Sequence, residues 1–175
     1  TDPFVLTRHL LGELAASGFV GVENAPSIGI IDGSFRRHLE EGGLGYEAEV
    51  AMIREARSLG LLSAAHVYDA GQSRVMADAG ADVLIVHEAD CDTLDAQLWK
   101  EPNTPAVAER LREMAVAVRE KRSEAIVLFH AATAASLARM QQLATQHACF
   151  DGVFCSDLVE DADDCVTIAE RVAGL

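Results

Sequence analysis

Hydrophobic and polar positions form two alternating patterns along the chain. Short, continuous apolar runs predict buried strands, and longer stretches with apolar residues every three to four positions predict helices. The predicted strands span 19–24, 61–67, 81–87, 124–130 and 150–156, and the predicted helices span 3–17, 46–59, 72–79, 104–122, 133 or 134 to 147, and 160–173. Because strand and helix alternate and the strands are apolar on both faces, the pattern predicts an α/β fold with a parallel sheet.

One connection is much longer than the others. Pro26 follows the first strand and stops its ladder of hydrogen bonds, and about twenty residues with five glycines and several charges then precede Tyr46. Connections in compact domains usually take about 4–6 residues, so a connection of this length favours a functional role. In an α/β fold it lies at the carboxyl end of its strand, where such folds build their sites.

Polar side chains recur where the predicted strands end. The first strand ends in Glu23 and Asn24, the second has His66 near its end, and the third and fourth end in His87 and His130. Polar groups that converge at the carboxyl ends of parallel strands are typical of the pocket of a (β/α) barrel.

Composition limits the kinds of partner. The chain has 175 residues, half of them hydrophobic, and is interpreted as one domain over 1–175. The 28 acidic residues outnumber the 14 Lys and Arg, and a net charge of −14 disfavours nucleic acid and anionic membrane surfaces as partners. A small anion remains compatible, since a local cluster such as Arg36 and Arg37 can override the mean field. The four cysteines have no metal-like or CxxC spacing, so we expect them to be reduced and the protein to be cytoplasmic.

Several short motifs occur together in this chain. They are Thr1-Asp-Pro-Phe4, Gly18-Phe-Val-Gly-Val-Glu-Asn24, Gly29-Ile-Ile-Asp-Gly-Ser-Phe-Arg36, Leu39-Glu-Glu41, Gly45-Tyr46, Glu49-Val50, Ala79-Gly-Ala-Asp82, His87 and His130. Together they resemble the TIM-barrel family called phosphoenolpyruvate hydrolase-like, also described as a TIM-barrel signal-transduction domain. The resemblance implies a partial (β/α)8 barrel in which this chain supplies about five strands, from the third helix to the eighth strand and helix.

Three loops depart from that family. Glu88-Ala-Asp-Cys-Asp92 stands in place of a Met-Gly-Leu-Thr-type loop, Ala131-Ala-Thr133 in place of Gly-Gly-Pro, and Cys155-Ser-Asp-Leu158 in place of a Gly-Ala-Ser-Ser segment. Glycine lets backbone amides approach a phosphate closely, so its loss weakens a phosphate cradle. His66 stands where the family usually has a tyrosine.

The first functional hypothesis is enzymatic. A lyase or hydrolase acts on a phosphoenolpyruvate- or keto-acid-like small anion through an enolate stabilised by Mg²⁺, a cation that prefers oxygen ligands. The candidate Mg²⁺ ligands are Asp32 and Glu40, the candidate proton-transfer residues are His87, His130 and Glu41, and the candidate substrate-binding residues are Arg36, Asn24, Glu23 and Tyr46.

Each candidate also has a structural interpretation. Asp32 is equally placed to be the N-cap of a short helix, and Arg36 to pair with Glu40 four residues on. His87 and His130 taken singly are typical of hydrogen-bonded structural histidines. Together with His66 they also suggest a three-histidine metal site, which we rank below the other interpretations.

The second hypothesis is non-catalytic: a regulatory barrel segment that binds a ligand or a partner chain. Five strands that do not close leave two sheet edges, at 19–24 and 150–156, and exposed edges favour pairing. We therefore expect a homo-oligomer or completion by another chain segment. A five-stranded doubly wound domain that folds alone is a third possibility.

Overall fold

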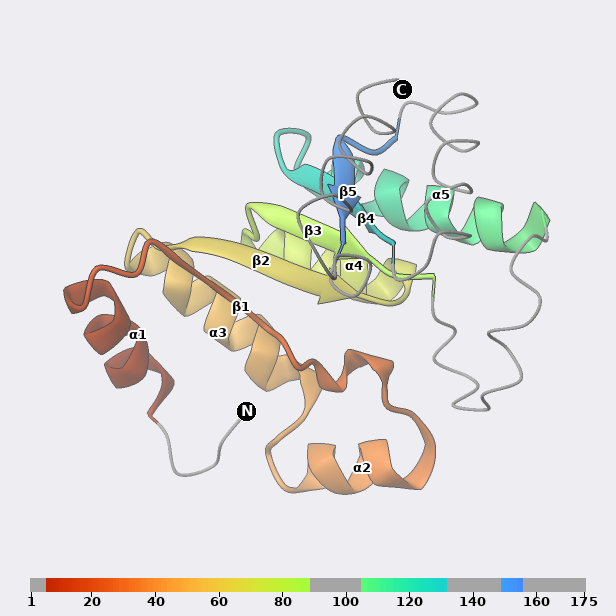
Figure 1. Ribbon diagram of the computed structural model, residues 1–175. Coiled ribbons are helices and arrows are strands. Elements are labelled where there is room, and N and C mark those ends of the chain that lie inside the picture. Colours follow the sequence, from red (N-terminus) through yellow and green to blue (C-terminus); the bar gives the residue numbers. More distant parts are fainter. Residues whose placement is uncertain (1–5, 89–104, 132–148, 156–175) are drawn as a thin grey trace.

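Five parallel strands alternate with helices in the computed structural model, which describes residues 6–88, 105–131 and 149–155 (Figure 1). In chain order the elements are α1 (Thr7–Ala16), β1 (Gly21–Glu23), the 3-10 helix η1 (Ile28–Ile30), α2 (Gly33–Glu41), α3 (Tyr46–Ser58), β2 (Leu62–Val67), α4 (Ala70–Ala79), β3 (Val83–Val86), α5 (Pro105–Lys121), β4 (Ile126–His130) and β5 (Gly152–Phe154). The predicted α/β class and parallel sheet are confirmed.

The strands lie in the sheet in the order in which they occur along the chain. The order is β1-β2-β3-β4-β5, and every neighbouring pair is parallel. Sequential order with parallel pairing is the arrangement of a (β/α) barrel wall, and it brings all the carboxyl ends to one edge. In the described part of the chain, β1 and β5 form the two edges of the sheet, where the sequence placed them.

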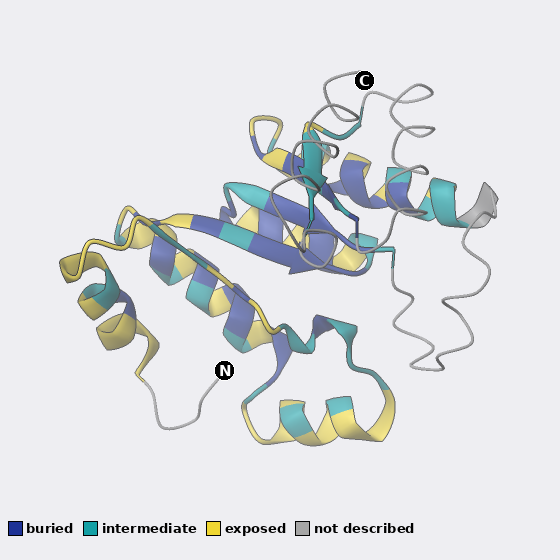
Figure 2. Ribbon diagram, in the orientation of Figure 1, coloured by how far each residue is buried: buried dark blue, intermediate teal, exposed yellow. Residues whose placement is uncertain are grey.

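Helices cover one face of this sheet. α1 packs against α3, α3 against α4, and α4 against α5, so the four helices form one continuous layer (Figure 1). The core between sheet and helices is mostly aliphatic, as expected for a chain with few aromatic residues. Its fully buried large side chains include Val50, Ile53, Met76, Leu84, Val86, Leu111, Met114, Val127 and Phe129 (Figure 2).

Strand periodicity determines which face each polar residue occupies. Ala65 and Val67 of β2 pack in the core beneath the helices, so His66 between them points to the opposite face. By the same alternation His87 and His130 point to that opposite face of β3 and β4. The three histidines therefore share the face that lines the interior of a barrel.

Several boundaries differ from the predicted ones. The strand predicted over 19–24 is only three residues long, and the long connection contains η1 and α2 rather than irregular chain alone. Helix α4 begins earlier than predicted because the side chain of Asp69 caps it, accepting a hydrogen bond from the backbone N of Gln72 at 2.7 Å. Gly80 ends this helix in the left-handed conformation.

Some predictions fall outside the described residues. These are the helices predicted from 133 or 134 to 147 and over 160–173, and most of the loop Glu88-Ala-Asp-Cys-Asp92 that departs from the family. Within the ranges that the structure does describe, no helix combines the length and the apolar character needed to cross a membrane.

Candidate site at the carboxyl ends of the strands

Three histidine rings from adjacent strands lie together. Nδ1 of His66 is 2.7 Å from Nε2 of His87, a hydrogen-bond distance. The rings of His87 and His130 are stacked, with centroids 4.2 Å apart. The ring of Tyr68 lies 4.5 Å from that of His87, and Phe154 of β5 contacts both His66 and His130. The proximity of His87 and His130 that the strand ends predicted is therefore present, and His66 joins them.

The backbone of His66 is held by two of the predicted substrate-binding residues. Asn24 accepts a hydrogen bond from the backbone N of His66 at 2.7 Å through Oδ1. The hydroxyl of Tyr46 donates to the carbonyl O of His66 at 3.3 Å. Both side chains are buried, so their observed contacts are with the protein. A contact with substrate stays a prediction for each.

A buried carboxylate lies behind this arrangement. Glu49, which is 3% exposed, accepts hydrogen bonds from Nδ2 of Asn24 at 2.6 Å, from Oγ of Ser27 at 2.7 Å and from the backbone N of Ile28 at 2.7 Å. These bonds tie the connection after β1 to α3. Glu49 has no predicted role from the sequence, although a signal exists. Glu49 lies on the buried stripe of α3, one residue before Val50 and three after Tyr46.

The connection also approaches the sheet closely at Gly29. Nε2 of Gln72 donates to the carbonyl O of Gly29 at 2.9 Å. A Cβ atom at Gly29 would lie 2.9 Å from ring carbons of both Tyr46 and Tyr68, too close for van der Waals contact. Glycine is therefore required here by the close approach.

Arg36 makes several contacts within the same connection. Its Nε donates to Oε1 of Glu40 at 2.5 Å, and its Nη1 donates to the carbonyl oxygens of Ile28 at 3.0 Å and Ile31 at 3.3 Å. The guanidinium carbon lies 5.6 Å from the centre of the Tyr46 ring, a cation–π distance. The pair with Glu40 that the spacing suggested is present. Anion binding by Arg36 stays a prediction, and it would use Nη2 or displace Glu40.

The environment shifts two pKa values strongly. Burial, together with the neighbouring rings of His130 and His66, lowers the pKa of His87 to about 2. Burial, followed by the negative charge of Glu49, raises the pKa of Tyr46 far above its usual value of 10. His87 is therefore a neutral imidazole at physiological pH, and the Tyr46 hydroxyl keeps its proton and remains a hydrogen-bond donor.

Glu23 lies beside the other nitrogen of His66. Its Oε2 is 3.6 Å from Nε2 of His66, and the Glu23 side chain is half exposed. Nε2 of His66 is buried and has no hydrogen-bond partner among the described residues. Glu23 is therefore a predicted substrate-binding residue whose carboxylate faces an imidazole nitrogen of the histidine cluster.

The remaining candidates belong to α2, which lies apart from the sheet (Figure 1). Asp32 occupies the N-cap position, although its side chain makes no capping hydrogen bond, and Glu40 and Glu41 are exposed on the helix. Across the described residues no three His, Cys, Asp or Glu side chains are grouped as a metal site requires. The three-histidine metal site is therefore wrong. Nδ1 of His66 and Nε2 of His87 face each other at 2.7 Å, which leaves no space for an ion between them.

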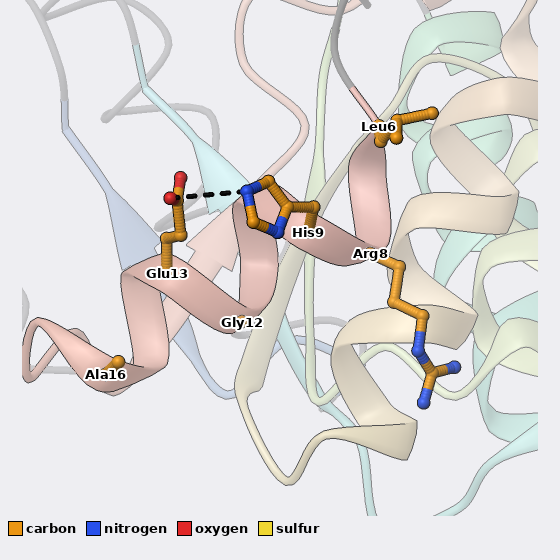
Figure 3. Close-up of a pocket in the computed structure, with 6 residues that line it drawn as sticks. All are labelled: Leu6, Arg8, His9, Gly12, Glu13 and Ala16. Carbon is orange, nitrogen blue, oxygen red and sulfur yellow. Dashed lines mark ion pairs between the residues drawn. The ribbon is translucent and has the colours of Figure 1, made fainter.

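A separate open hollow lies on the outer side of α1 (Figure 3). It is lined by Leu6, Arg8, His9, Gly12, Glu13 and Ala16, and within it His9 pairs with Glu13. None of its lining residues comes from a strand end.

Sequential parallel strands, an outer helical layer and polar groups at the carboxyl ends define a (β/α) barrel segment. The crystal structure of dihydrodipicolinate synthase, a TIM barrel, is similar to it, with a TM-score of 0.57 at 12% identity. The similarity covers 95% of this chain and 54% of that one, and at this identity it shows the fold alone.

The family model described as phosphoenolpyruvate hydrolase-like matches residues 1–172. The chain belongs to this family, as its motifs predicted. Among its relatives are the ToMV resistance protein Tm-1(GCR237) and the ToMV susceptible protein tm-1(GCR26) of Solanum lycopersicum, each 44% identical over 87 residues. The protein y4oT of Sinorhizobium fredii is 32% identical over 96 residues.

These relatives are longer than the matched region. The match covers 50% of this chain and 12% of each tomato protein, and 55% of this chain and 49% of y4oT. The comparisons therefore show the family and the fold of this chain, and they do not extend to its activity, substrate or partners.

Proposed function

We propose that this chain supplies the proton-transfer residues of a lyase or hydrolase site that acts on a phosphoenolpyruvate- or keto-acid-like anion. The observation that supports the proposal best is the ring of His87, hydrogen-bonded to His66 and stacked on His130. The three rings lie at the carboxyl ends of parallel strands, where (β/α) barrels place their catalytic groups.

The chemistry of such anions suits a neutral histidine. Forming or consuming an enolate moves a proton at the carbon next to the carbonyl group while negative charge develops on the carbonyl oxygen. Through the ring nitrogen that does not contact His66, a neutral imidazole accepts the proton if that nitrogen is unprotonated, or donates a hydrogen bond to the oxygen if it carries the proton. The lowered pKa keeps His87 in this neutral form. His130, stacked on it, is the second candidate, and Glu41 stays a predicted participant.

An anionic substrate needs a local positive charge, because the net charge of −14 repels anions at long range. Arg36 is our candidate for this role. It lies against the ring of Tyr46, whose hydroxyl contacts the backbone of His66, so it borders the histidine site through one intervening residue.

Magnesium stays a predicted cofactor for the enolate chemistry. Asp32 and Glu40 remain the predicted ligands, but one Glu40 oxygen already accepts from Arg36, and two carboxylates alone do not complete a coordination shell. A bound Mg²⁺ would stabilise enolate charge. If Asp32 holds it, Asp32→Asn abolishes any Mg²⁺-dependent release of phosphate from phosphoenolpyruvate, and unchanged release would show that the ligand is misassigned.

Isotope exchange tests the proposal directly. The 175-residue chain is incubated with pyruvate in D2O, and loss of the methyl proton signal is followed by NMR. We expect exchange above the buffer rate that falls by about 100-fold or more in His87→Gln, the contribution typical of a general acid or base. His9→Gln, at an exposed position on α1, is the matched control. Exchange at the buffer rate by a chain that unfolds cooperatively would contradict the proposal.

The non-catalytic hypothesis has its own supporting observation. Phe19, Val20 and Leu62 are exposed apolar residues at or beside the β1 edge of the sheet. Exposed apolar groups along a strand edge favour association with another chain or a second copy. Sedimentation over a wide concentration range tests this: a mass that rises with concentration and falls in Val20→Lys favours it, and a monomer at every concentration argues against it.

A further inference from the structure

The ring of His66 lies between a carboxylate and a second imidazole. Its Nε2 faces Oε2 of Glu23 at 3.6 Å, and its Nδ1 faces Nε2 of His87 at 2.7 Å. Both backbone groups of His66 are also held, the N by Asn24 and the carbonyl O by Tyr46. The ring is therefore fixed in place with each nitrogen facing a different partner.

The position of the carboxylate decides where the protons lie. A lone pair on Nε2 of His66 would face the negative charge of Glu23, whereas an N–H there is attracted to it. A neutral imidazole carries one proton, so Nδ1 of His66 is then an acceptor. The short contact between the two rings requires one donor and one acceptor, so Nε2 of His87 has to be the donor.

We propose that His66 and Glu23 form a positioning pair that fixes His87 as the Nε2–H tautomer and leaves Nδ1 of His87 as the proton-accepting atom. The tautomer assignment follows from the contacts alone. Its catalytic consequence rests on the function proposed above.

The same contacts provide a path for charge. When Nδ1 of His87 accepts a proton, the proton on Nε2 of His87 passes to Nδ1 of His66. His87 is then neutral again, and His66 carries two N–H groups beside the Glu23 carboxylate. Return of the proton to Nε2 of His87 lets Nδ1 donate its own proton to the product, so no proton is gained or lost over the cycle.

This path offsets an electrostatic cost at His87. Among the residues that the structure describes, the titratable groups in contact with His87 are His66, His130 and Tyr68, and none of the three is a carboxylate that would balance an imidazolium. Moving the positive charge by one ring places it next to Glu23. Transient transfer of a proton through this site during the reaction then costs less than holding the charge on His87 alone.

Imidazole ¹⁵N NMR of the labelled chain reads the tautomer without any assay of activity. In the native chain we expect a protonated-type Nε2 and an unprotonated-type Nδ1 for His87. Glu23→Gln is expected to move population toward the Nδ1–H tautomer, while Glu23→Asp, which keeps the carboxylate, retains the native pattern. Because the Glu23 side chain is half exposed, its replacement should not threaten folding.

The kinetic readout is the pH profile of pyruvate proton exchange. Loss of a negative charge at this distance should lower the exchange rate at neutral pH by about tenfold and shift the midpoint of the profile. Glu13→Gln is the control, because Glu13 also lies beside a histidine, His9, but on the exposed side of α1. It is expected to change neither the tautomer of His87 nor the profile.

The two readouts separate this inference from the proposed function. An Nδ1–H tautomer in the native chain, or a tautomer that Glu23→Gln leaves unchanged, overturns the positioning pair. The expected tautomer in a chain that exchanges no pyruvate protons supports the pair and counts against the proposed function. Exchange that proceeds with the same profile in Glu23→Gln overturns the relay while the proposed function stands.

Discussion

Two histidine–glutamate pairs in this chain have similar separations and very different surroundings. His9 and Glu13 on α1 are 3.3 Å apart, with side chains 73% and 65% exposed (Figure 3). His66 and Glu23 are 3.6 Å apart, but the His66 side chain is only 9% exposed and its second nitrogen contacts another imidazole. Separation alone therefore says little about chemistry. Burial and the second partner turn one pair into a candidate site, and solvent leaves the other an ordinary surface contact.

The surroundings differ because the two regions are built differently. α1 is an outer helix with a single buried residue, Leu11, in its span. His66 lies one residue before the end of β2, between the buried Ala65 and Val67. Its backbone N is held by Asn24, which is held in turn by Glu49. Strong electrostatic effects need groups that are both desolvated and held in place. Of the two pairs, His66 and Glu23 meet this condition better, because the ring of His66 is buried and its backbone is held.

The largest expected effect comes from removing the buried carboxylate of Glu49, which lies behind the site. Glu49→Ala leaves the Asn24 amide and the backbone N of Ile28 without their buried acceptor. We expect a loss of about 3 kcal/mol or more in the free energy of unfolding, because hydrogen bonds to a buried charged group are costly to break. Urea denaturation followed by circular dichroism measures it.

Two further variants sharpen this measurement. Glu49→Gln keeps the shape but has one acceptor oxygen for three donors, so its loss should be intermediate. Glu13→Ala on α1 should stay within about 0.5 kcal/mol of the native chain. Equal losses for Glu49→Ala and Glu13→Ala would remove the distinction between the two regions.

The sequence predicted the strand ends well because a continuous apolar run and the polar residue that follows it are local features of the chain. That reasoning placed His87 and His130 side by side, and they are stacked. It did not find the role of Glu49 or the contact between His66 and His87. Those depend on which helix residue faces which loop and on ring orientation, which follow from the packing of segments distant in sequence. The roles of Asp32, Glu40 and Glu41 remain predictions, because charge along a loop does not fix where its side chains point.

The second test uses pH. The pKa of His87 is lowered from 6.5 to about 2 in the folded chain, so between these values the unfolded chain binds more protons than the folded one. The contribution of the neutral His87 ring to the free energy of unfolding is therefore fully present above about pH 6.5. It is lost as the pH falls toward 2. Between pH 6.5 and about pH 5 we expect a loss of about 2 kcal/mol, at about 1.4 kcal/mol per pH unit.

The variant His87→Gln should remove this contribution. Urea midpoints of the two chains, converted to free energies of unfolding, are compared over that pH interval, so that the slope with pH and not the absolute stability is the readout. His9→Gln serves as the control from the exposed region. If the free energies of unfolding of the native chain and of His87→Gln changed with pH in parallel, burial would not keep His87 neutral. His87 and the exposed His9 would then not differ in this respect.

The smallest expected effect belongs to the exposed pair itself. A double-mutant cycle with His9→Gln and Glu13→Gln should give a coupling energy below about 0.5 kcal/mol, decreasing further as salt is added, because water and ions screen charges at the surface. The same cycle with His66→Gln and Glu23→Gln should give a larger coupling, since burial of the His66 ring reduces that screening. If the exposed pair coupled as strongly as the strand-end pair, burial would not be the cause of the difference, and the case for Glu23 as a positioning residue would have to rest on the tautomer of His87 alone.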